Sequence, residues 1–293
     1  MRSLLLAGLC LAFPFSAAHA QQAPAGDGIN PRPPATPIKA SKIILVGDST
    51  VQQLSGWGGS FCASHVTSFL ACVNLARGGR STYNYRAEGS WDLALAEMKT
   101  PGFVKTWVLI QFGHNDQPGK PGRSTDLATE FPANLKRYIA ETRAAGAVPV
   151  LVTPLTRRQF KQGKLDRDLD PWADAIRKVA AEEHAPLVDL NRRSADAVEA
   201  LGPAASARFA QMAPSPDVAT ALLTGTSVSN APPAAPGTPA PQPQNNAAVE
   251  RMGDAKLSFD YTHLGPAGAD FFSKMVVDEL AIAVPEMRRL LVP

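Results

Sequence analysis

One serine and a distant aspartate–histidine pair are the side chains of this sequence best suited to covalent chemistry. Ser49 follows the apolar residues 43–46 after a Gly-Asp pair, and Asp260 and His263 lie three positions apart. A serine hydroxyl becomes a nucleophile when a neutral histidine accepts its proton and a carboxylate orients the imidazole ring. The spacing therefore predicts nucleophilic catalysis, with Ser49 as nucleophile, His263 as base and Asp260 as the orienting acid.

Three donors suit the negative charge that builds on a carbonyl oxygen when a serine attacks it. They are the backbone N–H groups of Ser49 and Gly79 and the side-chain amide of Asn115. Glycine lets the backbone approach a substrate closely, and an amide donates without competing as a base. Each motif also has an ordinary structural interpretation as a helix cap, a tight bend or an Asx turn. The predicted oxyanion hole depends on all three donors meeting at one place.

Short apolar runs alternate along the chain with stretches of helical spacing. This alternation favours an α/β fold, a three-layer sandwich with a central five-stranded parallel sheet and helices on both faces. Because functional loops of such sheets lie at the carboxyl ends of the strands, Ser49, Gly79 and Asn115 are expected at one rim. The strands are expected at residues 42–46, 72–75, 106–112, 148–152 and 186–190, and the helices at 58–70, 87–98, 127–145, 172–183 and 264–284.

The chain divides into a leader and one large domain. A basic start, an apolar stretch and a small-x-small end fit a signal peptide over residues 1–20. The apolar stretch is shorter than the about 18 residues of a membrane span, so we expect a periplasmic or secreted protein with no membrane partner. A Pro-rich leader follows at residues 21–41. Residues 42–293 form the catalytic domain, in which the Ala/Pro-rich residues 203–248 indicate an insertion or flexible loop.

Charge and cysteine content narrow the functional classes. Because 29 basic residues face 26 acidic ones, the net charge is +3, which does not indicate a nucleic-acid partner. Cys62 and Cys72 either form a disulfide or lie apart as separate small side chains, since geometry decides between the two. Their spacing has no companion ligand of a zinc site, and we expect neither a metal nor a cofactor.

The motifs resemble those of the SGNH hydrolases, also called GDSL-type esterases. The four residues that name this superfamily match Ser49, Gly79, Asn115 and His263. The resemblance implies a flavodoxin-like SGNH hydrolase fold and a two-step hydrolysis through an acetyl-enzyme on Ser49. The neighbouring segments look like those of rhamnogalacturonan acetylesterases, which deacetylate pectin, at residues 56–58, 76–81, 112–116 and 260–269.

An acetylated polysaccharide or oligosaccharide is the partner that this resemblance implies. Guanidinium groups bind carboxylates such as those of galacturonate, and aromatic rings stack on sugars. The arginines have an alternative role, in which they are solvated or pair with Glu88, Asp166 and Asp168. The candidate substrate-binding residues are Asp48, Trp57, Arg80, His114, Arg157 and Arg158.

Two other functions fit the same residues. A lipase or thioesterase of this superfamily would act on longer acyl chains, and a non-catalytic carbohydrate-binding module would keep the fold without turnover. The preferred acyl-chain length distinguishes the first, and labelling by a serine-reactive probe distinguishes the second. The sequence gives no indication of the oligomeric state.

Overall fold

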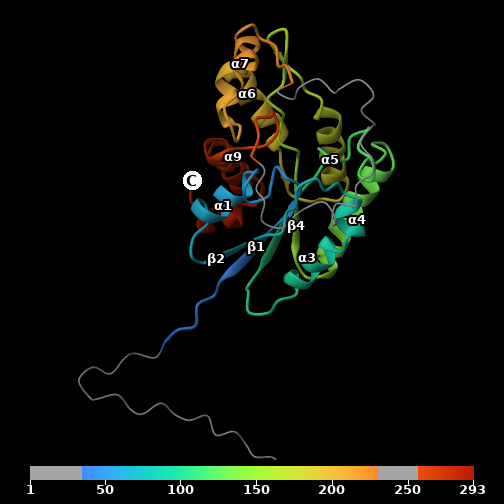
Figure 1. Cartoon of the computed structure of the whole chain (residues 1–293). Coiled ribbons are helices and arrows are strands. Elements are labelled where there is room, and N and C mark those ends of the chain that lie inside the picture. The colour runs from blue at the N-terminus through green and yellow to red at the C-terminus, as the bar shows by residue number, and fades with distance from the viewer. Residues whose placement is uncertain (1–34, 230–256) are drawn as a thin grey trace, which may run out of the picture. The chain divides into compact units, whose positions relative to one another are not determined.

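Five parallel strands form the central layer of the computed structural model of the chain (Figure 1). They are β1 (Ser41–Gly47), β2 (Leu70–Asn74), β3 (Thr106–Gln111), β4 (Val148–Val152) and β7 (Leu187–Val188). Their order across the sheet is β2-β1-β3-β4-β7, and every pairing is parallel, which confirms the predicted sheet.

The structure describes residues 35–229 and 257–293. Within this range Ile38–Pro293 belongs to one compact unit. The predicted signal peptide, most of the Pro-rich leader and residues 230–248 lie outside the described residues, so these domain boundaries stay predictions. No helix in the described ranges combines the length and hydrophobicity that a membrane crossing requires.

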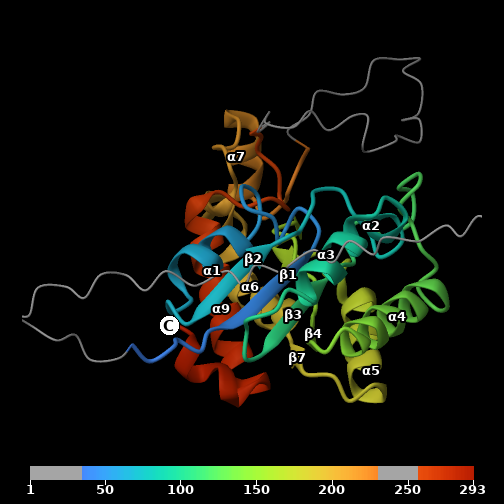
Figure 2. The same ribbon diagram turned by 90° about the horizontal axis from the view of Figure 1, so that it is seen from below.

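Helices cover both faces of the sheet (Figures 1 and 2). One face carries α1 (Gly58–Ser64), α6 (Leu190–Ser206) and α9 (Pro266–Ala283), and the other carries α3 (Ser90–Met98), α4 (Glu130–Ala144) and α5 (Asp170–Glu182), with α2 (Asn84–Ala87) just before α3. Successive residues of β1 point to opposite faces, so Leu45 packs in the first layer and Val46 in the second. Both side chains are fully buried, which stabilises the fold by about 1.5–3 kcal/mol each.

Helices form residues 203–209 and 216–223 of the Ala/Pro-rich segment, and irregular backbone forms residues 210–215 and 224–229, so a flexible loop does not describe the helical parts. Helix α6 continues through Gly202, whose φ of 75° kinks it. The 3-10 helix η1 (Ala207–Phe209) follows, and α7 (Pro216–Leu223) begins at Ser215, whose side chain caps it. The small alanine side chains of this segment pack with larger ones into a third and smaller hydrophobic cluster, which we call the satellite core. It consists of Ala207, Ala210, Val218, Leu222, Phe259 and Tyr261.

A short hairpin and a 3-10 helix near the end of the chain also have no counterpart among the predicted elements. A hairpin joins β5 (Phe160–Lys161) to β6 (Lys164–Leu165), and the 3-10 helix η2 (Pro285–Leu290) follows α9. The hairpin turn has a φ of 51° at Gln162 and 79° at Gly163. Positive φ at both central residues matches the twist of a two-residue hairpin.

A disulfide joins Cys62 of α1 to Cys72 of β2. The two Cα atoms lie 5.4 Å apart, within the range that such a bond requires. The structure thus decides between the two arrangements that the sequence left open. The bond ties a helix to the edge strand of the sheet.

Candidate active site

The candidate site lies where the order of the strands changes direction. Strand β1 lies between β2 and β3, so the chain adds β2 on one side of β1 and then crosses to add β3, β4 and β7 on the other side. Loops diverge at such a switch point and leave a crevice at the carboxyl ends of the strands. The loops after β1, β2 and β3 carry Ser49, Gly79 and Asn115. The segment before α9 joins them, since the Leu264 N–H donates to the Ser55 carbonyl at 2.8 Å.

Ser49, His263 and Asp260 form a continuous chain of hydrogen bonds. His263 Nε2 lies 2.8 Å from Ser49 Oγ, and His263 Nδ1 lies 2.7 Å from Asp260 Oδ2. Burial alone would raise the pKa of Asp260, but the hydrogen bond and charge of His263, together with two backbone N–H donors, lower it to about 2. An ionised Asp260 fixes the tautomer in which Nδ1 carries the proton and Nε2 accepts the serine proton.

Glycines bring the loop after β2 against the nucleophile. A Cβ atom on Gly78 would lie 3.6 Å from Ser49 Cβ, and Gly79 has a φ of 73°, a conformation that favours glycine. Asn115 Nδ2 donates to the Arg80 carbonyl at 3.0 Å. Because an amide nitrogen has two hydrogens, this bond orients Asn115 and uses one of them. The structure therefore gathers the predicted nucleophile, base, acid and oxyanion donors at one rim.

Asp116 holds the loop after β2 and the loop after β3 together. Its Oδ1 accepts from the Thr82 N–H at 3.0 Å and from the Thr125 hydroxyl at 3.0 Å, and its Oδ2 accepts from the Gly113 N–H at 3.2 Å. Burial, the largest influence, raises the pKa of this carboxyl to about 7 despite the hydrogen bonds. The sequence indicated only an Asx turn here, because the partners in the loop after β2 are distant along the chain.

Asp48 and His114 lie beneath the site rather than on its surface. Asp48 is fully buried and accepts from the Thr50 N–H and hydroxyl at 2.8 Å each, while His114 Nδ1 lies 3.4 Å from Asp48 Oδ2. Burial would raise the pKa of Asp48, but the charge of His114 and the bonds from Thr50 lower it. Both side chains are buried and Asp48 is bound to Thr50, so the structure gives no support to their predicted contact with substrate, which stays a prediction.

Three more candidate substrate residues are buried structural groups. Trp57 is fully buried, and its Nε1 donates to Gln111 Oε1 at 3.0 Å. Arg80 is 2% exposed and donates to Glu88 Oε1 at 2.7 Å, and Arg158 is 1% exposed. Their burial gives no support to the predicted substrate contacts, which stay predictions, and Arg80 takes the alternative role of pairing with Glu88. Residue type alone did not predict this burial, because neighbouring layers of the fold decide which aromatic and arginine side chains are covered.

Arg157 lies at the rim of the site. Lys120 and Arg123, which were not predicted from the sequence, lie near it. Arg157 Nε donates to Thr262 Oγ1 at 3.3 Å, and its guanidinium also pairs with Asp168. A Cβ atom on Gly79 would lie 3.0 Å from Arg123 Nη1. Burial and the positive charges of Arg157 and Arg123 lower the pKa of Lys120. We call these three residues the cationic rim; Lys120 and Arg123 sit in a polar loop, where no sequence pattern distinguished them.

Two comparisons by sequence give one family. Residues 45–270 match the model of the GDSL-like lipase/acylhydrolase family. The probable rhamnogalacturonan acetylesterase YesY of Bacillus subtilis (strain 168) is 37% identical over 162 residues, which cover 53% of this chain and 72% of the relative. The rhamnogalacturonan acetylesterase RhgT of the same organism is 36% identical over 179 residues, which cover 58% and 74%.

A solved structure shares the fold. The protein YXIM of Bacillus subtilis matches with a TM-score of 0.55 at 22% identity. The match covers 84% of this chain and 57% of that one. At this identity the likeness supports the α/β architecture alone.

Proposed function

Because the chain belongs to the GDSL-like lipase/acylhydrolase family of carboxylic ester hydrolases, we propose that it removes O-acetyl groups from pectic rhamnogalacturonan outside the cytoplasm. Both curated relatives carry the name of a rhamnogalacturonan acetylesterase, which supports a carbohydrate acetylesterase. The observation that carries the proposal is the hydrogen-bonded chain from Asp260 through His263 to Ser49.

In the first half of the proposed reaction, Ser49 Oγ attacks the acetyl carbonyl carbon while His263 Nε2 takes the hydroxyl proton. The carbonyl oxygen becomes negative and accepts from the backbone N–H groups of Ser49 and Gly79 and from the free hydrogen of Asn115 Nδ2. The bond from the carbonyl carbon to the sugar oxygen then breaks. His263 returns its proton to that oxygen, and the sugar leaves with a free hydroxyl.

In the second half, water takes the place of the sugar. His263 Nε2 accepts a proton from the water as its oxygen attacks the acetyl-enzyme, and the same donors bind the second oxyanion. The bond to Ser49 Oγ breaks, and the serine recovers its proton from His263. Acetate is released and the site returns to its starting state.

The cationic rim supports an acidic sugar as the substrate. Lys120 is half-buried, and no described side chain forms an ion pair with its ammonium group. The positive charges of Arg123 and Arg157 disfavour the protonated form of Lys120, so an anion bound beside its ammonium group would be favourable. A galacturonate carboxylate of rhamnogalacturonan would supply such an anion to Lys120, whereas xylan backbones are neutral.

Export from the cytoplasm is supported by residues 1–20 and by the disulfide. Disulfides persist in oxidising compartments and are rare in the cytosol of mesophiles, so the Cys62–Cys72 bond fits a periplasmic or secreted protein. Sequencing the N-terminus of the protein from the periplasm and the culture medium tests this proposal. We expect the mature chain to begin at Gln21; a chain retained in the cytoplasm with Met1 would contradict it.

A fluorophosphonate probe tests the proposed nucleophile. We expect the probe to label Ser49 in the native protein, and Ser49→Ala to lose both the label and the hydrolysis of p-nitrophenyl acetate. Ser273→Ala is the matched control, because Ser273 is a fully buried serine of α9 outside the site. A folded native protein without label or turnover would favour the carbohydrate-binding module.

Acetate release from two polymers tests the substrate. We expect faster release from acetylated rhamnogalacturonan than from acetylated xylan, and faster hydrolysis of p-nitrophenyl acetate than of the decanoate ester. Faster release from xylan would overturn the role of the cationic rim. A preference for decanoate would favour the lipase or thioesterase function.

A further inference from the structure

A buried arginine contacts the backbone of the segment that carries Asp260 and His263. Arg158 Nη2 donates to the Asp260 carbonyl at 3.0 Å and to the His263 carbonyl at 2.8 Å, and Nη1 donates to the Thr262 carbonyl at 3.3 Å. The Arg158 backbone N–H donates to the Tyr261 carbonyl at 2.8 Å. One residue thus binds all four carbonyls of the Asp-x-x-His turn.

Both Nη groups of the Arg158 guanidinium bind these carbonyls, while its Nε has no hydrogen-bond partner among the described residues. Arg158 is 1% exposed, and the negative charge of Asp260 favours its protonated form. Burying a charged group is costly, and the carbonyl hydrogen bonds replace part of the lost water. Burial lowers the pKa of Arg158 to about 10, so it stays protonated at neutral pH.

The same turn is held from the other side by its own carboxylate. Asp260 Oδ1 accepts from the Thr262 N–H and from the His263 N–H, each at 2.7 Å. Asp260 therefore binds the donors of the turn and Arg158 binds its acceptors. With both sets fixed, the backbone has little freedom to rotate the imidazole of His263 away from Ser49.

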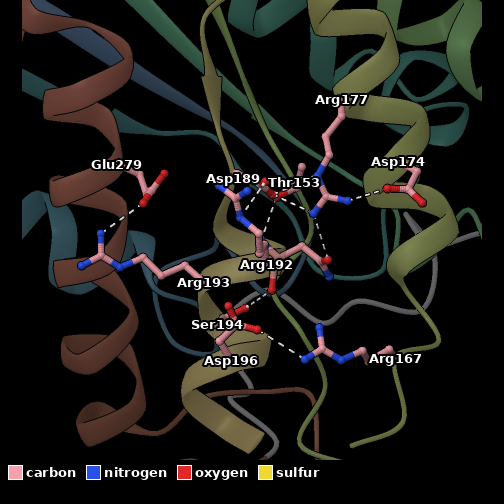
Figure 3. Close-up of polar contacts among 11 residues, drawn as sticks. Thr153, Arg167, Asp174, Arg177, Asp189, Arg192, Arg193, Ser194, Asp196 and Glu279 are labelled. Carbon is pink, nitrogen blue, oxygen red and sulfur yellow. Dashed lines mark hydrogen bonds and ion pairs between the residues drawn. The ribbon is translucent and has the colours of Figure 1, made fainter. Parts of the chain in front are cut away.

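The loop that carries Arg158 is itself anchored to α6. Thr153 Oγ1 donates to Asp189 Oδ1 at 3.1 Å, and the Thr156 N–H donates to Ser194 Oγ at 3.1 Å. Arg177 of α5 binds Asp189 at 2.8 Å, so helices α5 and α6 together hold the start of the loop (Figure 3). Arg158 thus extends from a rigid part of the fold.

We infer that Arg158 is a positioning residue, whose guanidinium fixes the turn of residues 260–263 so that His263 Nε2 faces Ser49 Oγ. It contacts no reacting atom and acts through His263. The inference rests on the proposed role of His263 as base. The Ser49→Ala and His263→Ala variants test that role separately, so the two failures are distinguishable.

The test compares Arg158→Gln in two backgrounds. Because a displacement of about 1 Å at a reacting group can cost about 10²-fold in rate, we expect kcat for p-nitrophenyl acetate to fall about 100-fold, with KM changed less than about twofold. In the His263→Ala background, Arg158→Gln should not lower the residual rate further, because residues that act as a unit are non-additive. Arg158→Lys keeps the charge but not the planar fork, so it should restore only part of the rate.

Stability measurements separate positioning from folding. Arg193→Gln is the matched control, because Arg193 bridges α6 to α9 through Asp278 and Glu279 and should affect melting but not kcat. A folded Arg158→Gln protein with a kcat within about twofold of the native value would overturn the inference. So would an equal loss in the His263→Ala background. If Arg158→Gln does not fold, Arg158→Lys carries the test, and failure of both to fold would show that Arg158 acts on stability alone.

Discussion

Replacing Asn115 with alanine removes one amide that has a proposed role in catalysis and an observed hydrogen bond in the fold, and the two losses can be measured separately. Asn115 Nδ2 donates to the Arg80 carbonyl at 3.0 Å and has a second hydrogen for the oxyanion. Losing one oxyanion donor costs about 2.7–4 kcal/mol of transition-state stabilisation, or about 10²–10³ in kcat. A buried carbonyl that loses its donor costs about 1–3 kcal/mol of folding free energy.

The two losses are measured by different assays. Initial rates on p-nitrophenyl acetate give kcat, and thermal unfolding gives Tm, which should fall about 2–4 °C for each kcal/mol in a domain of this size. Asn74→Ala is the matched control, because Asn74 Nδ2 also donates to a backbone carbonyl, that of Val51, at 2.9 Å. The control should lower Tm and leave kcat within about twofold of the native value.

Asn115→Asp sharpens the same test. A carboxylate keeps the shape of the amide but accepts where the amide donates, and its charge repels an oxyanion. We expect a larger loss of kcat than with alanine. A folded Asn115→Ala protein that retains native turnover would refute the proposed role, because the second Nδ2 hydrogen would then not be needed to bind the oxyanion.

Three further predictions follow from the rim, the disulfide and the turn. Lys120→Met should raise KM for acetylated rhamnogalacturonan about tenfold, because a hydrogen bond to a charged group contributes about 1.5–3 kcal/mol. The rate on p-nitrophenyl acetate should not change. Lys136→Met is the control, because Lys136 is an exposed lysine. Removing the Cys62–Cys72 bond by a double Cys→Ala substitution should lower the free energy of unfolding in urea by about 3 kcal/mol, and an unchanged value would contradict the loop-entropy argument. The pKa of Asp260 is about 2 in the folded chain, against an ordinary value of 3.8. Its ionised form therefore stabilises the fold at pH values above 3.8, and this contribution is lost as the pH falls through about 2. Urea unfolding should show Asp260→Asn less stable than the native chain at neutral pH, with the gap closing at acid pH.

The strands could be predicted because a strand that is buried on both faces is a continuous run of apolar residues in the sequence. Each of β1, β3 and β4 is a run of apolar residues, and nothing polar interrupts them except at their ends. Ser49 and Asn115 were proposed for a related reason, since they follow β1 and β3 within a few residues, whereas Asp260 and His263 were proposed from their own spacing. Helix α6 has no counterpart among the predicted helices, although it spans Leu190–Ser206, and helical geometry is interrupted at Gly202 just before Pro203.

The lining of the site could not be predicted from residue types. Trp57 and Arg158 have the chemistry to bind sugars and carboxylates, yet both are covered by other layers of the fold. Lys120 lies in a loop whose sequence predicts only a turn, and it reaches the rim because Asp116 binds Thr125 at the end of that loop. Such placements depend on contacts between distant segments, which short patterns do not record.

The satellite core has a consequence for how the enzyme loses activity. Phe259 and Tyr261 pack in it on either side of Asp260, and the Tyr261 hydroxyl donates to the Val228 carbonyl at 2.8 Å. A cluster this small buries far less apolar surface than the sheet, so it opens at a lower free energy than the whole domain. Mild heating should therefore inactivate the enzyme reversibly while the signal of the central sheet is unchanged, and activity and circular dichroism followed together would show two separate transitions. The temperature limit of catalysis would then be set by a few side chains of α7 and its neighbours and not by the central sheet and the helices that cover it.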